Sequence, residues 1–213
     1  MARTRSAESY KRRAPQFKVQ PLVLVVCEDK KSSKTYFEEA SRHFRAYAQV
    51  EFFHSGKTDP LGVVNSALKR LNAFDHVYCV IDRDSHDERN FQSAVALSSA
   101  NAGQITLLTS YPCFEFWLIL HFGYTRAPFV SLGGVSAADR VVQQLKSNPV
   151  MSDYAKGNVA KLFERLLPLL PVARNNAARS VAEAAIEGDW NPSTPLHLLI
   201  ERFEKLGDLV PTD

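Results

Sequence analysis

The first half of the chain alternates between short apolar runs and segments with helical periodicity. Runs of β-branched and other apolar residues, which predict buried strands, occupy residues 19–27, 48–54, 76–82 and 104–110. Apolar side chains recur at helical spacing in residues 32–49, 60–71, 88–100 and 113–122. Asp59 and Pro60 predict a cap and a first-turn proline for the second of these helices. Regular alternation of strand and helix is typical of an α/β fold with a mostly parallel sheet and helices on its faces. We therefore expect that architecture for residues 19–122.

The pattern changes after Gly123. Helical periodicity covers residues 136–148, 157–170, 174–187 and 195–206, and no further strand is convincing there. Thr194 and Pro195 indicate a helix cap followed by a first-turn proline. A loop with glycine, proline and serine, residues 123–134, is the expected linker. The sequence thus predicts a helical C-terminal segment, residues 123–213, attached to the α/β core.

Charge is unevenly distributed along the chain. Residues 1–18 hold six basic residues and one acidic residue, a net charge of +5, whereas the whole chain has a net charge of +3. The remaining residues therefore sum to −2, and we expect residues 1–18 to form a basic flexible arm. Such an arm either contacts a polyanion or serves only as a solvated tail.

The composition narrows the class of protein. A chain of 213 residues with 45% hydrophobic content can bury a core of its own. No apolar run approaches the roughly 20 residues that a membrane span requires, and the basic N-terminus lacks the apolar centre of a secretory signal. Cys27, Cys79 and Cys113 lack CxxC spacing, which favours buried thiols over a disulfide framework or a zinc site. A cytoplasmic protein without membrane contact is the expectation.

Acidic residues close two of the predicted strands. Glu28 and Asp29 follow the first strand, and Asp82 and Asp84 lie at the end of the third. The carboxyl ends of parallel strands form the ligand-binding edge of a sheet, and residues two apart on an extended segment point the same way, about 6–7 Å apart. Carboxylates this close favour a cation between them, and all-oxygen ligation suits Mg²⁺ or Mn²⁺. The alternative is that these residues are ordinary solvated turn formers.

A further carboxylate, Glu115, lies in the apolar window of residues 113–122. An unpaired carboxylate there would be costly, so Glu115 needs a partner such as a metal ion or a lysine. A buried salt bridge or a carboxylate at a helix N-terminus is the alternative. His121 lies about 240° further around the helix, so we expect a structural histidine and not a ligand of the same ion.

These motifs resemble those of known families. A buried strand ending in Glu28, followed after a helix, a strand and a helix by a strand ending in DxD, resembles the Toprim domain of topoisomerases, bacterial primases and OLD-type nucleases. More closely, VLVVCEDKKSSKTYF, VYCVIDRD, SYPCFEFWLILHF and the late NPST resemble the RloB family of Toprim-like bacterial proteins, often encoded near restriction or other antiphage defence systems. The likeness covers residues 20–122 and, more weakly, the C-terminal part. Asp29 departs from the pattern, because a glycine often follows the Toprim glutamate; it either repositions Glu28 or adds a ligand.

The resemblance implies a Toprim/Rossmann-like core with metal-dependent chemistry on nucleic-acid phosphodiesters. Glu28, Asp82 and Asp84 match the Toprim acidic residues and are implied to hold one or two Mg²⁺ or Mn²⁺ ions. Glu115 matches the acidic residue of an RloB-like motif and is implied to be a further metal ligand or a base. Lys34 is implied to neutralise charge that builds on the phosphate, with a merely solvated first-turn lysine as the alternative.

From this resemblance we expect a Mg²⁺-dependent nuclease that acts as an antiphage-defence effector, on DNA in preference to RNA. A defence-system protein is an expected partner, and self-association is left open. The alternative from another class is a non-catalytic nucleic-acid-binding or regulatory subunit of a defence system. Nucleotidyl transfer, as in primases, would need a nucleotide pocket that the sequence does not locate. No tyrosine can be assigned as a topoisomerase nucleophile, which favours hydrolysis.

Overall fold

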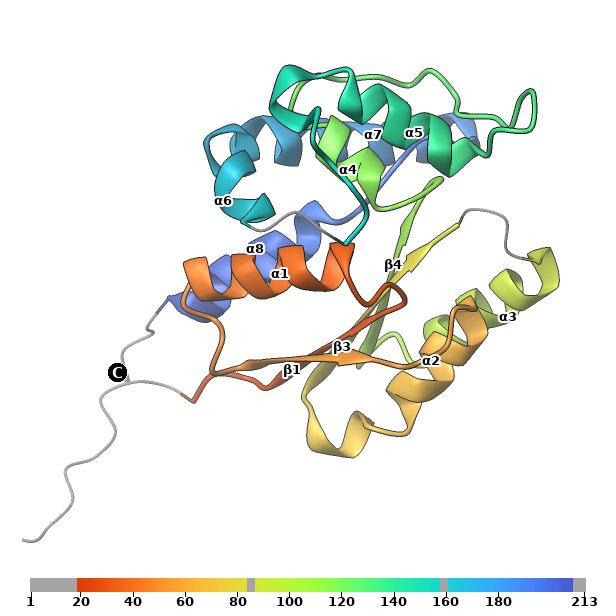
Figure 1. Cartoon of the computed structure of the whole chain (residues 1–213). Helices are drawn as coiled ribbons and strands as arrows, with labels where there is room; N and C mark the ends of the chain where they lie inside the picture. The colour runs from red at the N-terminus through yellow and green to blue at the C-terminus, as the bar shows by residue number, and fades with distance from the viewer. Residues whose placement is uncertain (1–18, 84–86, 158–160, 209–213) are drawn as a thin grey trace, which may run out of the picture.

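The structure is a computed structural model that describes residues 19–83, 87–157 and 161–208. Within these ranges the chain forms a four-stranded, all-parallel sheet with helices on both faces, which confirms the expected α/β fold (Figure 1). The strands are β1 (Val23–Cys27), β2 (Val50–His54), β3 (His76–Asp82) and β4 (Ile105–Ser110), in the order β2-β1-β3-β4. The predicted basic arm, residues 1–18, lies outside the described residues.

One face of the sheet is covered by α2 (Pro60–Leu68) and α3 (Glu88–Ser99), with the 3₁₀ turn η2 (Leu71–Ala73) leading into β3. Leu24 and Val26 of β1 point into this layer, because alternate residues of a strand face opposite sides of the sheet. The predicted cap of α2 is confirmed: Asp59 Oδ1 accepts the backbone N–H of Gly62 at 2.8 Å. Every residue of β1 is buried, so this central strand is covered on both faces.

The opposite face is covered by α1 (Ser32–His43) and by the helical C-terminal part (Figure 1). The same face carries α4 (Glu115–Ile119), and the C-terminal part comprises α5 (Ala137–Lys146), η3 (Pro149–Met151), α6 (Leu162–Leu166), η4 (Leu167–Leu169), α7 (Leu170–Glu187) and α8 (His197–Gly207). The side chains of α1, β1 and all of these α-helices contribute to one continuous hydrophobic cluster. The core thus runs without a break across the predicted linker.

Helix α8 lies beside α1 and completes this face (Figure 1). Phe203 of α8 is fully buried, with its ring centroid 6.3 Å from that of Phe37 on α1 and 6.0 Å from that of Phe52 on β2. Gly207 approaches the end of α1 so closely that an added Cβ would lie 1.6 Å from the carbonyl oxygen of Phe44. The last helix in sequence is therefore part of the same core as the first strand.

Three local expectations differ from the structure. Helix α1 ends at His43 and not near residue 49, because the chain turns through Arg45, which has a φ of 59°. The apolar segment 113–122 forms only the short helix α4 and flanking turns. The expected cap at Thr194 is wrong: α8 begins at His197, and the Thr194 hydroxyl lies 2.9 Å from the Ser110 hydroxyl in a buried pair.

Cys27, Cys79 and Cys113 are buried free thiols, as expected. Burial raises the pKa of Cys27 and of Cys79 to about 12, so neither forms the reactive thiolate at neutral pH. In the part of the chain that the structure describes, no helix combines the length and apolar character needed to cross a membrane.

Candidate active site at the carboxyl edge of the sheet

Two acidic residues lie together where β1 and β3 end. The chain passes from β1 outward to β2 and then returns to β3 on the other side of β1, so the winding reverses between β1 and β3. The carboxyl side of such a reversal is where parallel sheets bind ligands. Glu28 directly follows β1 and Asp82 ends β3, and the backbone N–H of Asp82 donates to Glu28 Oε2 at 3.1 Å. The sheet topology thus brings both predicted residues to one point.

Glu115 joins this pair from the start of α4. The backbone N–H of Phe114 hydrogen-bonds to the Asp82 carboxylate, and the next residue, Glu115, is only 2% exposed. Burial, and then the negative charges of Glu115 and Glu28, raise the pKa of Asp82 well above its usual range. Three carboxylates from three separate segments therefore share one electrostatic site, here named the carboxylate cluster (Glu28, Asp82 and Glu115).

Two residues of the C-terminal part complete the surroundings of Glu115. The Tyr154 hydroxyl, which is buried, donates to Glu115 Oε1 at 2.9 Å. The Lys156 ammonium lies 3.8 Å from Glu115 Oε2, and its side chain is 52% exposed. The charge of Lys156 also acts against the rise in the pKa of Asp82. A lysine is therefore one partner of Glu115. This ion pair is the salt bridge given as the alternative for Glu115, and the role of Glu115 as a metal ligand stays a prediction.

The segment that carries Tyr154 and Lys156 is anchored to the start of α1. The backbone N–H of Gly157 donates to Ser32 Oγ at 3.1 Å, and the Lys31 side chain packs across Gly157. Sequence reasoning missed both Tyr154 and Lys156, since they follow η3 in a loop without a motif. Only the tertiary packing of the C-terminal part brings them to the carboxylate cluster.

Gly157→Ala is expected to lower the free energy of unfolding and to disturb the carboxylate cluster. Gly157 has a φ of +78°, and an added Cβ would lie 2.4 Å from Lys31 Cδ and 2.6 Å from Lys31 Cβ. A left-handed conformation alone costs about 1–2 kcal/mol for a residue with a Cβ. Chemical denaturation measures the loss, with Gly103→Ala as the control, because a Cβ at Gly103 meets no atom within 4 Å. Equal stability of the two variants would contradict this role of Gly157.

Asp29 has a structural role that the sequence left unexplained. Its Oδ1 accepts the backbone N–H of Lys31 at 3.0 Å, and its Oδ2 accepts the backbone N–H of Ser33 at 2.9 Å and that of Ser32. These N–H groups belong to the first turn of α1, where no backbone carbonyl is available to them. Asp29 therefore caps α1 and fixes the turn between β1 and the helix, with Glu28 immediately before it.

Lys34 lies on α1 and pairs along the helix. Its ammonium is 2.6 Å from Glu38 Oε1, one turn further on, and both side chains are partly exposed. Its implied contact with a phosphate stays a prediction. Lys30 and Lys31, in the turn before α1, are exposed and add positive charge close to Glu28.

Asp84, the remaining predicted metal ligand, lies outside the described residues.

His121 is buried, its Nδ1 donates to the carbonyl of Trp117 at 3.0 Å, and its Nε2 lies 3.4 Å from the Tyr36 hydroxyl. Burial lowers the pKa of His121 to about 4, so the ring is neutral at physiological pH. The expectation of a structural histidine is confirmed.

The donor chemistry of the carboxylate cluster suits a hard divalent cation. Carboxylate oxygens are the ligands that Mg²⁺ and Mn²⁺ prefer, and a cation would relieve the repulsion that raises the pKa of Asp82. Across residues 19–83, 87–157 and 161–208, no three histidine, cysteine, aspartate or glutamate side chains are grouped so as to hold a metal ion. The residues fit a metal in charge and donor type, and the described part of the chain does not supply a complete ligand set.

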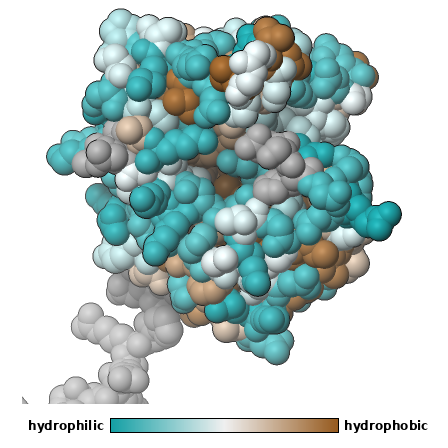
Figure 2. All heavy atoms as spheres, turned by 45° about the vertical axis from the view of Figure 1, so that its right-hand side comes forward, coloured by the Kyte–Doolittle hydropathy of each residue, from teal (hydrophilic) through white to brown (hydrophobic). Residues whose placement is uncertain are grey.

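The side of the molecule on which β3 and β4 end comes forward in Figure 2. This face is largely hydrophilic, with a hollow near its centre where hydrophobic atoms lie at depth (Figure 2). A hydrophilic, hollowed face at the carboxyl edge of a parallel sheet is where a polar ligand is expected to enter.

Comparison with protein families gives one match to this chain. A family model described as RloB-like protein matches residues 23–203, which span both the α/β core and most of the helical C-terminal part. Comparison with curated proteins and with solved structures gives no match.

Proposed function

The chain belongs to the RloB-like family, and from this membership and the carboxylate cluster we propose that it is a metal-dependent nuclease of Toprim type that hydrolyses nucleic-acid phosphodiesters. The observation that carries the proposal is the convergence of Glu28, Asp82 and Glu115 at the point where the winding of the sheet reverses. Acidic residues whose charges raise the pKa of a neighbouring carboxylate, as Glu115 and Glu28 do for Asp82, are typical of functional sites. Structural roles alone give no reason to place all three together.

In this proposal the acidic residues hold the metal and the nearby cations hold the substrate. Glu28, Asp82 and Glu115, with Asp84 as the fourth member, would bind Mg²⁺ or Mn²⁺. When bound, such an ion polarises a phosphate oxygen and favours ionisation of a water molecule. Glu115 alternatively accepts the proton of the attacking water. Its orientation is fixed by the hydroxyl of Tyr154.

Lys156, whose side chain is about half exposed, could contact a phosphate oxygen close to Glu115. A cation placed there stabilises the negative charge that builds on the phosphate in the transition state. Lys30 and Lys31 attract the sugar-phosphate backbone to the same edge by charge alone. Lys156, from the C-terminal part, thereby joins Lys34 as a candidate for the phosphate contact.

The resemblance to RloB proteins also suggests a biological role, a substrate and a partner. The nuclease would be an antiphage-defence effector, with DNA as the expected substrate and a defence-system protein as the activating partner. A second function, nucleic-acid binding without turnover, is favoured by one observation: the described acidic residues do not by themselves form a metal-binding group. A regulatory subunit could use the same edge to bind a phosphate backbone.

Glu28→Gln and Glu115→Gln are expected to abolish metal-dependent cleavage. Each variant removes a ligand charge and keeps the size of the side chain, whereas Glu51→Gln changes an exposed acid on β2 and serves as the control. Supercoiled plasmid, single-stranded DNA and RNA would be incubated with each protein in Mg²⁺, Mn²⁺ or EDTA. Calorimetric titration with Mn²⁺ alone would measure metal binding in the same proteins.

Cleavage that requires metal and is lost in both variants, but not in Glu51→Gln, supports the nuclease. Metal binding that is lost in the variants, without cleavage by the unaltered protein, supports the binding subunit or an effector that awaits its trigger. Metal binding and cleavage that are unchanged in both variants would remove the carboxylate cluster from the mechanism.

A further inference from the structure

A groove opens one residue beyond the carboxylate cluster. Asp82 is paired with Ser110 in the register of β3 and β4, and the following residues, Arg83 and Tyr111, line a groove of about 420 Å³ together with Phe91 and Trp190. The backbone N–H of Arg83 donates to the carbonyl of Ser110 at 2.8 Å, so β3 and β4 end side by side at the groove. Ligand sites in proteins typically have volumes of about 300–1,000 Å³.

The groove presents an exposed aromatic surface. Trp190 is 41% exposed, and its ring stacks on that of Tyr111 with centroids 6.1 Å apart and an angle of 29° between the planes. Arg83 lies over Phe91 on the other side of the groove, 4.7 Å from the ring centroid. Exposed aromatic rings of this kind bind nucleobases by stacking, because every base has a flat π-face.

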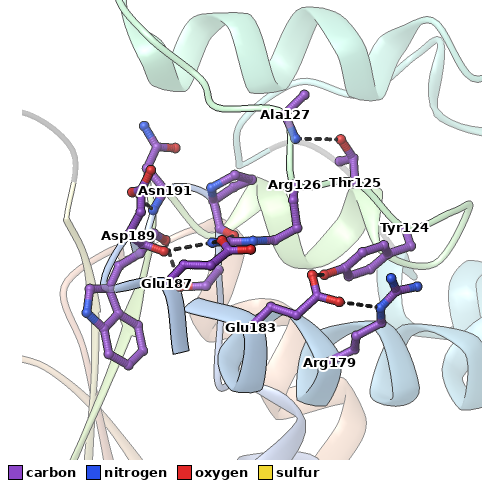
Figure 3. A network of polar contacts seen from close by, with 12 residues as sticks. Tyr124, Thr125, Arg126, Ala127, Arg179, Glu183, Glu187, Asp189 and Asn191 are labelled. Carbon is purple, nitrogen blue, oxygen red and sulfur yellow. Dashed lines mark hydrogen bonds and ion pairs between the residues drawn. The ribbon is translucent and has the colours of Figure 1, made fainter. Parts of the chain in front are cut away.

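Hydrogen bonds hold the turn that carries Trp190, and Figure 3 shows Arg126 beside Glu187 and Asp189 of this turn. Arg126 donates to Glu187 at 2.8 Å, to the carbonyl of Asp189 at 2.7 Å and to the carbonyl of Pro192. The Asn191 amide donates to the carbonyl of Phe129 at 2.7 Å. Beyond it, the backbones of Ser193 and Tyr111 exchange hydrogen bonds at 2.8 and 3.2 Å.

This frame keeps the Trp190 ring in place before any ligand arrives. A side chain that is already ordered loses little conformational entropy on binding, which strengthens a stacking contact. The late NPST motif, residues 191–194, is thus the anchor of the groove wall and not a helix cap.

The charged residues that line the groove favour binding of a nucleobase over binding of a phosphate group. Its lining includes one basic residue, Arg83, which forms an ion pair with Glu88, and a second acid, Asp189. Two carboxylates and one paired arginine disfavour a phosphate group, whereas carboxylate oxygens can accept the N–H groups of a nucleobase. The bases of a duplex are stacked inside it, so only an unpaired base can enter.

From this geometry we infer that the groove formed by Arg83, Phe91, Tyr111 and Trp190 binds an unpaired nucleobase of the substrate strand by stacking on Trp190. The inference deepens the proposed nuclease function, on which it rests, and assigns single-stranded nucleic acid as the substrate class. Arg83, which lines the groove, directly follows Asp82 in the chain, so the groove and the carboxylate cluster are neighbours at the end of β3.

Trp190→Ala is expected to weaken binding of a single-stranded oligonucleotide about tenfold, the usual loss when a stacking side chain is removed. Binding would be measured by fluorescence anisotropy of labelled single-stranded DNA, single-stranded RNA and a duplex, all in EDTA so that no strand is cleaved. Trp190→Phe should retain most of the affinity. Leu198→Ala removes a comparably exposed apolar side chain, 43% exposed on α8, and should change nothing.

Two further measurements separate stacking from a loss of structure. Single-stranded nucleic acid should quench the fluorescence of the unaltered protein far more than that of Trp190→Phe, because the other tryptophan, Trp117, is fully buried. The slope of log affinity against log salt should be the same in Trp190→Ala as in the unaltered protein, since stacking releases no counterions.

Equal single-strand affinity of Trp190→Ala and the unaltered protein would overturn the inference. So would a parallel loss of duplex affinity, or the absence of single-strand binding by the unaltered protein. These binding results are independent of cleavage. If Trp190→Ala binds single strands as the unaltered protein does, while Glu115→Gln loses the cleavage that the unaltered protein shows, only the groove is rejected. A Trp190 effect without any cleavage keeps the groove and favours the non-catalytic binding subunit over the nuclease.

Discussion

Asp82→Asn is expected to abolish metal-dependent cleavage and, without metal, to make the protein more stable. Residues that merely orient a metal ligand contribute about 10–100-fold to affinity or activity, so loss of a direct ligand should cost at least about 100-fold. The opposite effect on stability arises because burial and the charges of Glu115 and Glu28 disfavour the Asp82 carboxylate. Asparagine keeps an oxygen for the Phe114 N–H and removes that charge. A gain of about 1–2 kcal/mol is typical when a strained functional group is replaced.

The pH dependence of this gain follows from the direction of the pKa shift. The pKa of Asp82 is higher in the folded protein than its usual value of 3.8, so ionisation destabilises the fold as the pH rises from there to the raised pKa. Below about pH 4 the carboxyl group is protonated in both states, and Asp82→Asn should match the unaltered protein. Above that pH the difference should grow as the pH rises toward the raised pKa of Asp82.

Thermal unfolding with and without Mn²⁺ measures both effects. Saturating metal at about 100 times its dissociation constant should stabilise the unaltered protein by about 2.7 kcal/mol and Asp82→Asn by far less. Glu51→Gln, an exposed acid on β2, should behave as the unaltered protein does. A metal-free Asp82→Asn that is less stable at pH 7 would show that the charge of Asp82 supports the fold.

Phe203→Ala is expected to destabilise the whole chain by about 3–5 kcal/mol, the usual cost of removing a fully buried phenylalanine side chain. Phe203 lies between Phe37 of α1 and Phe52 of β2, so the cavity would open against the sheet itself. The prediction treats the α/β core and the C-terminal helices as one cooperative unit, because a single hydrophobic cluster includes both.

Urea denaturation tests this prediction when it is followed by circular dichroism and by fluorescence in a Trp190→Phe background, which leaves Trp117 as the fluorescent tryptophan. Both signals should move together to a lower midpoint, since Trp117 of α4 lies in the same cluster. Leu198→Ala, an exposed leucine on the same helix, is the matched control. Two separate unfolding transitions, with only the circular dichroism signal shifted to a lower midpoint, would instead make residue 122 a true domain boundary.

The parts of the fold that were predictable from the sequence depend on local signals. Apolar runs located all four strands, and the Asp59-Pro60 pair marked the start of α2. The meeting of Glu28 and Asp82 was predictable because each follows or ends a buried strand, and parallel strands all end at the same edge of the sheet. The cap formed by Asp29 also had a local signal, since an aspartate three residues before Ser32 is a usual way to begin a helix.

What the sequence did not predict depends on long-range packing. Tyr154 lies 39 residues beyond Glu115 and carries no motif, so its hydrogen bond to Glu115 follows only from the folding of the C-terminal part. Thr194 had the local pattern of a cap, but its buried contact with Ser110, 84 residues away, outweighs that preference. Trp190 was likewise unmarked, since nothing near it in sequence indicates that it stacks on Tyr111.

Because α8 packs beside α1, this face of the sheet can be completed only at the end of chain synthesis. A ribosome delivers β1 and Glu28 long before α8, so a growing chain holds the acidic residues of the sheet without the helix that covers its second face. The loop with Tyr154 and Lys156 emerges between the two. A chain that stops before α8 therefore leaves the apolar face of the sheet partly uncovered, and one that stops before Tyr154 lacks a partner of Glu115.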